Sequence, residues 1–220
     1  MIVEIPNVFS QNEVKDIVDK LSASEFIDGK KTAGWNARAV KNNEQLKASD
    51  PAAAALKEMV KTKLNKNFRF QSTVRPKNIH TLLFSRYEVG MSYGRHNDNA
   101  MMSGKWRTDV SFTIWLTAPE TYKGGDLVIE GPSRESSYRL AAGSAITYPS
   151  STLHRVDPIT EGSRWAIVGW VQSWIRDPAH REILYDLDTA RRSIFDTHGK
   201  NKEFDLVSKS LTNLLRSWME

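Results

Sequence analysis

Two residues in the middle of the chain have the types and the spacing of a metal-binding pair. His96 and Asp98 are separated by a single residue. Side chains two positions apart on an extended strand point to the same side, so this imidazole and this carboxylate can bind one ion. The best candidate for a third ligand is His154. Two histidines and one carboxylate on one face of a metal, with the other positions open, are typical of non-haem Fe(II) oxygenases.

The H-x-D triplet is a weak signal when it is taken alone. The chain has five histidines and many acidic residues, so a His–Asp pair on the surface is the alternative interpretation. The context favours a metal site, because Asp98 closes a strand-like segment and His154 follows a predicted strand and a turn. The residues between them leave room for several strands to bring the chain back to the same place.

Arg164 is the fourth residue whose position suggests chemistry. It falls where the chain enters an apolar segment, beside Trp165 and Ile167, and an unpaired charge would be costly there. A guanidinium matches a carboxylate through two parallel hydrogen bonds. A dicarboxylate co-substrate would satisfy it, and the alternative is a structural or surface arginine.

Short strands are the elements that must position these residues. Turn signals at residues 123–125, 131–132 and 142–143 separate five strand-like segments: 81–87, 110–116, 126–130, 144–148 and 165–171. Strands of this length with regular turns indicate a sandwich or a jelly roll. We therefore expect the site to lie in a β core, with further strands at residues 2–8 and 35–40.

Helices are predicted on both sides of this core. Ser10 and Glu13 form a capping box ahead of a helix over 11–22, and Asp50 with Pro51 begins a second one. Helical spacing returns after Trp174, with Gly199 between two segments. The expected fold is α+β, with N-terminal helices and supporting strands in 1–78, the core in 79–174 and a helical hairpin in 175–220. We expect the hairpin to pack on the β core or on a second subunit as a homodimer, with the core favoured.

The composition narrows the possible sites and partners. The chain has 220 residues and no cysteine, so a metal must be held by nitrogen and oxygen ligands, which suits Fe(II) or Mn(II). We find no apolar run of the ~20 residues that span a bilayer and no signal peptide, and we expect a cytoplasmic protein without membrane contact. Residues 1–80 carry 14 Lys and Arg against 9 Asp and Glu, while the remainder is balanced. A solvated surface explains this excess better than nucleic-acid binding does.

The spaced motif as a whole resembles a known family. The run Tyr87-x-x-Gly90-x-x-Tyr93-x-x-His96-x-Asp98, followed by Gly124-Gly125, His154 and Arg164, is similar to the Fe(II)/2-oxoglutarate dioxygenases of the prolyl and lysyl hydroxylase type. The length, residues 95–98 and 153–156 and the helical tail most resemble the bacterial PKHD-type hydroxylases, a group associated with iron uptake. The resemblance covers the chain nearly end to end.

The resemblance implies a double-stranded β-helix, or jelly roll, and a role for each motif residue. His96, Asp98 and His154 would be the iron ligands, and Arg164 would bind the distal carboxylate of 2-oxoglutarate. Tyr87 would add a hydroxyl near the co-substrate, although a strand aromatic equally suits the core. Related animal enzymes often have a tyrosine on the strand over 110–116, where this chain has Trp115, so the second co-substrate contact stays open. Ser111 and Thr113 share one strand face with Trp115 and are candidates to line the pocket.

The implied reaction uses Fe(II), 2-oxoglutarate and O2, with L-ascorbate as a further cofactor of such enzymes, and yields succinate and CO2. The substrate is unidentified: a peptide, a siderophore-like molecule or another small molecule. Residues 99–106 form either a lid or substrate loop over the site or an ordinary solvent loop. We expect substrate specificity to lie in this segment and along the basic N-terminal region. The remaining histidines, His80, His180 and His198, have no matching carboxylate and are expected to be structural or exposed.

Two rival functions stay open at this point. An iron enzyme of the same class could act on nucleic acid, but the chain lacks the interleaved basic and aromatic stripe that would favour it. A cupin-like sensor could bind a metal, or a metal with 2-oxoglutarate, without turnover. Arg164 favours the enzyme, because a protein that binds only a metal needs no carboxylate clamp.

Overall fold

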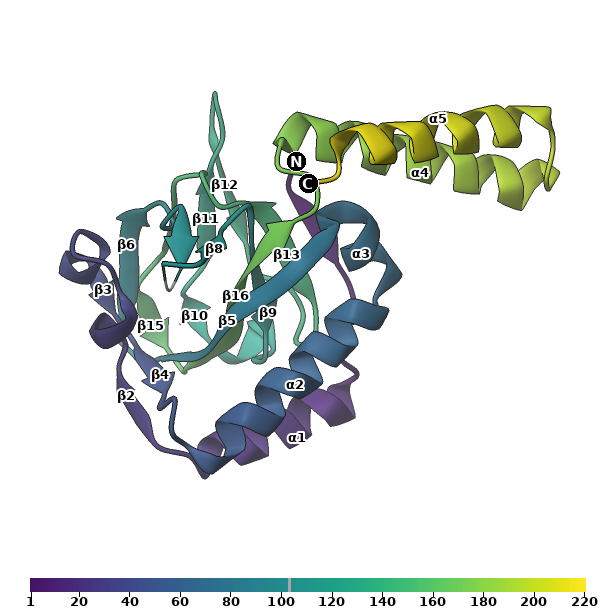
Figure 1. The fold of residues 1–220 in the computed structure, drawn as a ribbon. Coiled ribbons are helices and arrows are strands. Elements are labelled where there is room, and N and C mark those ends of the chain that lie inside the picture. Colours follow the sequence, from purple (N-terminus) through teal and green to yellow (C-terminus); the bar gives the residue numbers. More distant parts are fainter. Residues whose placement is uncertain (103) are drawn as a thin grey trace.

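Two antiparallel sheets form the centre of the computed structural model, which describes residues 1–102 and 104–220 (Figure 1). The larger sheet has the order β1-β13-β9-β16-β5-β4-β2 and the smaller has the order β12-β11-β14-β6-β3. The larger consists of β1 (Val3–Ile5), β2 (Phe26–Asp28), β4 (Glu44–Leu46), β5 (Pro76–Tyr87), β9 (Val110–Trp115), β13 (Ala145–Pro149) and β16 (Arg164–Ser173). The smaller consists of β3 (Lys41–Asn42), β6 (Ser92–His96), β11 (Leu127–Glu130), β12 (Glu135–Tyr138) and β14 (His154–Val156).

Two short pairs complete the β structure. They are β7 (Met101–Met102) with β8 (Trp106–Arg107), and β10 (Lys123–Gly124) with β15 (Ile159–Glu161). The seven-stranded and the five-stranded sheet pack face to face, because one buried apolar cluster contains residues from both. These residues are Tyr87, Trp115, Ile146, Tyr148, Leu127, Ile129 and Val156. This is the predicted jelly-roll arrangement, and the predicted α+β fold class is confirmed.

Helices α1 (Gln11–Ser22), α2 (Pro51–Lys66) and α3 (Phe68–Val74) cover the outer face of the larger sheet (Figure 1). Strand β9 is covered on both faces of the larger sheet, since its six residues are all buried. Phe112 and Ile114 join the apolar cluster under the helices, while Trp115 joins the cluster between the sheets. Ser111 and Thr113 share the inward face with Trp115, because side chains alternate along a strand.

The last two helices, α4 (Pro178–His198) and α5 (Lys202–Trp218), form an antiparallel hairpin that projects away from the sheets (Figure 1). Their buried apolar residues, Leu184 and Leu211, contact one another and Ile175. Helix α4 also contacts α3, where Arg192 lies over the ring of Phe68 at 3.5 Å. The hairpin therefore packs on itself and on α3 more than on the β core, which differs from the expectation.

Three helices begin at the capping residues that the sequence predicted. The capping box of Ser10 and Glu13 is present at α1, and the side chains of Asp50 and Asp177 cap α2 and α4.

Strand β5 begins at Pro76, and strands from the first 50 residues pair into both sheets. The division at residues 78 and 174 stays a prediction. None of the helices in the described ranges has the length and the apolar character to cross a membrane.

Residues 35–40 were predicted to form a strand, and this prediction is wrong. They form a turn and a 3-10 helix over Ala37–Ala39, and Trp35 is 89% exposed. A pattern of apolar residues suggests a strand only where a partner strand can bury them. The short strands β2, β3 and β4 and helix α3 were not predicted, because two or three residues carry no readable periodicity and α3 follows α2 after one residue.

Candidate metal and co-substrate site

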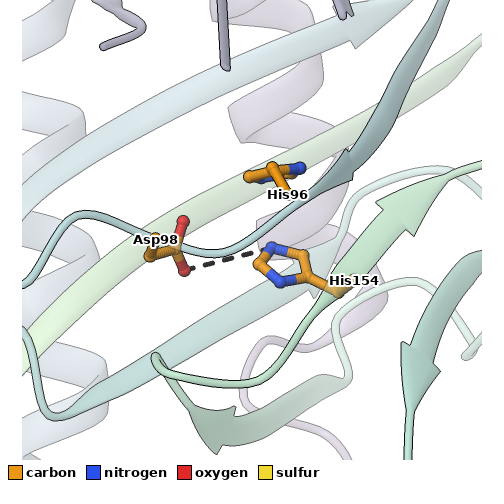
Figure 2. Close-up of side chains that lie close together, drawn as sticks. All are labelled: His96, Asp98 and His154. Atoms are coloured by element: carbon orange, nitrogen blue, oxygen red, sulfur yellow. Dashed lines mark ion pairs between the residues drawn. The ribbon is translucent and has the colours of Figure 1, made fainter. Parts of the chain in front are cut away.

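His96, Asp98 and His154 lie together at one end of the smaller sheet. Strands β6 and β14 pair so that His96 stands directly opposite His154, and the two ring centroids are 4.3 Å apart. Asp98 follows β6 by two residues, and its Oδ2 lies 3.9 Å from His154 Nε2 (Figure 2). One ligand atom from each residue lies within 4.8 Å of the others. The sheet register therefore brings together the three residues that the sequence pattern selected.

Backbone and hydroxyl groups orient all three side chains. The Nδ1 atom of His96 lies 2.8 Å from the carbonyl oxygen of Gly94, and Nδ1 of His154 lies 2.9 Å from that of Thr152. Each Nδ1 then carries the proton, which leaves Nε2 with its lone pair directed at the cluster. The hydroxyl of Ser111 donates to Asp98 Oδ2 at 2.5 Å.

Burial keeps the imidazole of His96 in the form that binds a metal. His96 and His154 are both buried, and this burial lowers the pKa of His96 to about 4, with the nearby His154 as the second cause. A neutral imidazole is the metal-binding form of histidine. Two neutral imidazoles and one carboxylate fit a divalent cation such as Fe(II). Within residues 1–102 and 104–220, no other group of His, Cys, Asp or Glu has this geometry.

Arg164 lies on the larger sheet, where β16 pairs it with Tyr87 of β5. Its side chain is 1% exposed, and its guanidinium carbon lies 5.4 Å from the ring centroid of Tyr87 and 5.5 Å from that of Trp115. In the described part of the chain, Arg164 has no ion pair, and its Nε has no hydrogen-bond partner. A buried guanidinium without an anion is costly, so this arrangement fits a carboxylate from a bound molecule.

One cavity, of about 770 Å³ including its open mouth, connects these groups. Its wall includes the three metal-ligand candidates, Arg164 and Tyr87. Burial raises the pKa of Tyr87, so its hydroxyl stays protonated and can donate a hydrogen bond. The cavity can hold a metal and an anionic molecule at the same time.

The strand β9 contributes to the cavity as the sequence suggested, with one exception. Ser111 and Thr113 line it, but Trp115 does not. The indole of Trp115 is fully buried behind Arg164, and its Nε1 has no hydrogen-bond partner among the described residues. The second co-substrate contact on this strand is therefore not assigned to Trp115.

Residues 99–106 border the cavity through Asn99 and Met102. They include β7 and the start of β8, while Ser103 lies outside the described residues. Two of the remaining histidines lie outside the cluster. His80 faces the carbonyl oxygen of Arg107 at 3.2 Å, and His180 stacks on Trp218.

Sequence reasoning assigned substrate specificity in part to the basic N-terminal region but named none of the residues there that line the cavity. Thr32, Lys41, Asn43 and Gln45 all line it. Lys41 and Asn43 are buried, and burial lowers the pKa of Lys41 to about 8. The only available signal was a lysine two residues from an asparagine in a segment without helical spacing, and that signal does not identify a cavity wall.

Known proteins are similar to this chain in fold and in sequence. The family model of the 2OG-Fe(II) oxygenase superfamily matches residues 82–172. Curated PKHD-type hydroxylases of Picosynechococcus sp. and Gloeothece citriformis are 56% and 57% identical over 220 and 221 residues, and each alignment covers 100% of both chains.

Solved structures with low sequence identity support the fold alone. A Pseudomonas putida prolyl-4-hydroxylase has a TM-score of 0.54 at 16% identity, covering 78% of this chain and 92% of its own. HygX from Streptomyces hygroscopicus, solved with nickel and 2-oxoglutarate bound, has a TM-score of 0.57 at 15% identity, covering 79% and 84%. Because full-length relatives share more than half of its residues, the chain belongs to the PKHD-type hydroxylases of the 2OG-Fe(II) oxygenase superfamily.

Proposed function

We propose that this enzyme hydroxylates a small molecule or a peptide in a reaction that consumes 2-oxoglutarate and O2 and releases succinate and CO2. The observation that carries the proposal is the buried Arg164, which has no ion pair among the described residues and shares a cavity with a cluster of two imidazoles and one carboxylate. A metal site alone would leave this guanidinium unexplained. A dicarboxylate bound beside a metal accounts for both features.

His96, Asp98 and His154 are the residues that would hold Fe(II). When bound, the metal would supply the O2 activation that hydroxylation of a carbon atom needs. The protein contributes fixed donors: the carbonyl oxygens of Gly94 and Thr152 hold the two imidazoles in one tautomer, and Ser111 orients the carboxylate. Such outer contacts tune both the geometry and the affinity of a metal site.

Arg164 would receive the distal carboxylate of 2-oxoglutarate through two parallel hydrogen bonds. Tyr87 stands opposite Arg164 in the sheet register, and its protonated hydroxyl is a second donor for the same carboxylate. Both side chains are almost fully buried, so water competes weakly for these hydrogen bonds. This assignment gives Tyr87 a role in binding as well as in the core.

Three further parts of the proposal rest on the resemblance or on position. L-ascorbate would keep the iron reduced, and succinate yield with and without ascorbate measures this. A link to iron uptake predicts that loss of the enzyme changes growth under iron limitation. Residues 99–106 would contribute to substrate choice because Asn99 and Met102 border the cavity. Substitutions at Met102 that leave substrate preference unchanged would count against that role.

The test begins without oxygen. Fe(II) and 2-oxoglutarate are added to the protein, and the visible charge-transfer band of the chelate is recorded. O2 is then admitted and succinate is measured. We expect a band and succinate from the wild type, and neither from His154→Ala. His198→Ala, which removes an exposed histidine of α4, is the matched control and should behave as the wild type does. A wild type without band and succinate would contradict the proposal.

A further inference from the structure

Lys41 is a buried cation in the cavity that the proposed reaction does not use. It lies on β3, is 5% exposed and lines the same cavity as Arg164. Among the described residues, no carboxylate oxygen lies within ion-pair distance of its Nζ; the nearest named contacts are Thr32 Oγ1 at 3.0 Å and the ring of Tyr93 at 5.1 Å. It also lies outside the segment that the family model matches.

These two contacts do not account for the burial of a charge. A cation over an aromatic ring contributes about 0.5–2 kcal/mol, and burying an ion costs several kcal/mol after relaxation. An ammonium has three N–H donors, and the described residues accept only one hydrogen bond from Lys41. The side chain therefore has donors available for a further acceptor in the cavity.

Asn43 provides a second observation at the same wall. It is 3% exposed and lines the cavity beside the side chain of Tyr87, and neither polar atom of its amide makes a hydrogen bond of normal length and angle within the described ranges. A buried amide without partners is costly, so native structures seldom contain one unless a ligand or water binds it. Lys41 and Asn43 stand two residues apart and both reach the cavity from the N-terminal segment.

Lys41 and Arg164 approach the cavity from different sheets. Lys41 pairs with Tyr93 in the smaller sheet, and the ring of Tyr93 stacks on His96 with centroids 3.6 Å apart. Arg164 belongs to the larger sheet and lies over Tyr87 and Trp115. Lys41 is thus on the His96 side of the metal-ligand cluster, whereas Arg164, on the other sheet, is the residue proposed to bind the co-substrate.

The charges of the loaded cavity indicate what Lys41 binds. The charged side chains in its wall, apart from histidine, are Lys41, Asp98 and Arg164. The charge of Fe(II) balances that of the 2-oxoglutarate dianion, and Asp98 balances Arg164. The single positive charge of Lys41 is left over. One carboxylate matches this charge, whereas a phosphate monoester carries about −1.5 to −2 at neutral pH.

We propose that Lys41 binds a carboxylate of the molecule to be hydroxylated and that the amide of Asn43 donates a further hydrogen bond to it. The substrate is then a carboxylate-bearing compound held by the N-terminal segment. This inference rests on the proposed function, because the charge balance includes Fe(II) and 2-oxoglutarate.

The test compares matched probes that differ only in charge: acetate, 3-phenylpropionate and decanoate, each with its amide. Calorimetry without oxygen measures their binding to protein loaded with Fe(II) and 2-oxoglutarate. We expect at least one carboxylate to bind about tenfold or more tightly than its amide, since hydrogen bonds to charged groups are worth about 1.5–3 kcal/mol. Lys41→Met should remove this preference by weakening the carboxylate while binding of the amide stays the same. A pocket that merely collapsed would weaken both probes.

Lys47→Met is the matched control, because Lys47 is an exposed lysine near the same segment and pairs with Glu25. It should keep the carboxylate preference. Lys41→Gln provides a second neutral variant if the first folds poorly. The inference is overturned if no carboxylate binds the wild type more tightly than its amide, or if the preference survives in both Lys41 variants. The chelate band, recorded on the same samples, separates this result from a failure of the proposed function.

Discussion

Replacement of Arg164 by methionine should have opposite effects on co-substrate affinity and on the stability of the free protein. Arg164 is 1% exposed and has no anionic partner in the described residues, so its charge is buried at a cost until 2-oxoglutarate binds. Loss of one partner of a buried, hydrogen-bonded charge pair costs about 3–5 kcal/mol, which is a roughly 10²- to 4 × 10³-fold rise in the Kd of 2-oxoglutarate. The free energy of unfolding without ligand should stay the same or rise, because methionine needs no anion.

Two measurements test this pair of effects. The chelate band gives the 2-oxoglutarate affinity, and urea unfolding gives the stability of the metal-free protein. Arg86→Met is the matched control on the neighbouring strand: Arg86 pairs with Glu44 and lies over Phe26. It should leave the 2-oxoglutarate affinity unchanged and lower stability by about 1 kcal/mol or less. An Arg164→Met protein that unfolds more easily yet binds 2-oxoglutarate normally would identify a structural arginine and refute the reasoning.

Three further predictions concern the metal, a helix cap and the hairpin. Ser111→Ala removes the hydroxyl that donates to Asp98 and should weaken Fe(II) binding by about 10- to 100-fold, measured by competition with a chelator; unchanged binding would exclude this orienting role. Asp50→Ala removes the side chain that accepts from the Ala52 amide at the start of α2 and should lower the midpoint of urea unfolding, with the chelate band unaffected. If α4 and α5 pack on a second subunit, sedimentation should give twice the chain mass, and a monomer at all concentrations would contradict such a homodimer.

The metal-ligand candidates and Arg164 could be predicted, because residue type and spacing within short segments of the sequence identify them. His96 and Asp98 come from one short segment, and His154 follows a strand of clear pattern. Arg164 is recognisable because a charge at the start of an apolar strand needs a partner. The β register then brings these positions together, as the pairing of His96 with His154 shows.

Lys41 and Asn43 could not be identified as cavity residues from the sequence, because the elements that carry them depend on distant partners. Strand β3 has two residues and exists only through its pairing with β6, about fifty positions later in the chain. Apolar residues alternate over residues 35–40, which is a pattern typical of a strand. In the structure, pairing with β6 begins only at Lys41, and residues 35–40 form a turn and a 3-10 helix. The hairpin was predicted as an element, while its contact with α3 depends on packing that the pattern does not contain.

A crystal structure of the enzyme grown with Fe(II) and 2-oxoglutarate without oxygen is the most direct test of the central claim. Anomalous scattering at the iron edge locates the metal independently of the protein. We predict one iron peak within bonding distance of Nε2 of His96, Nε2 of His154 and a carboxylate oxygen of Asp98, with the distal carboxylate of 2-oxoglutarate on Arg164. Iron at another position, or a carboxylate that does not contact Arg164, would contradict the account.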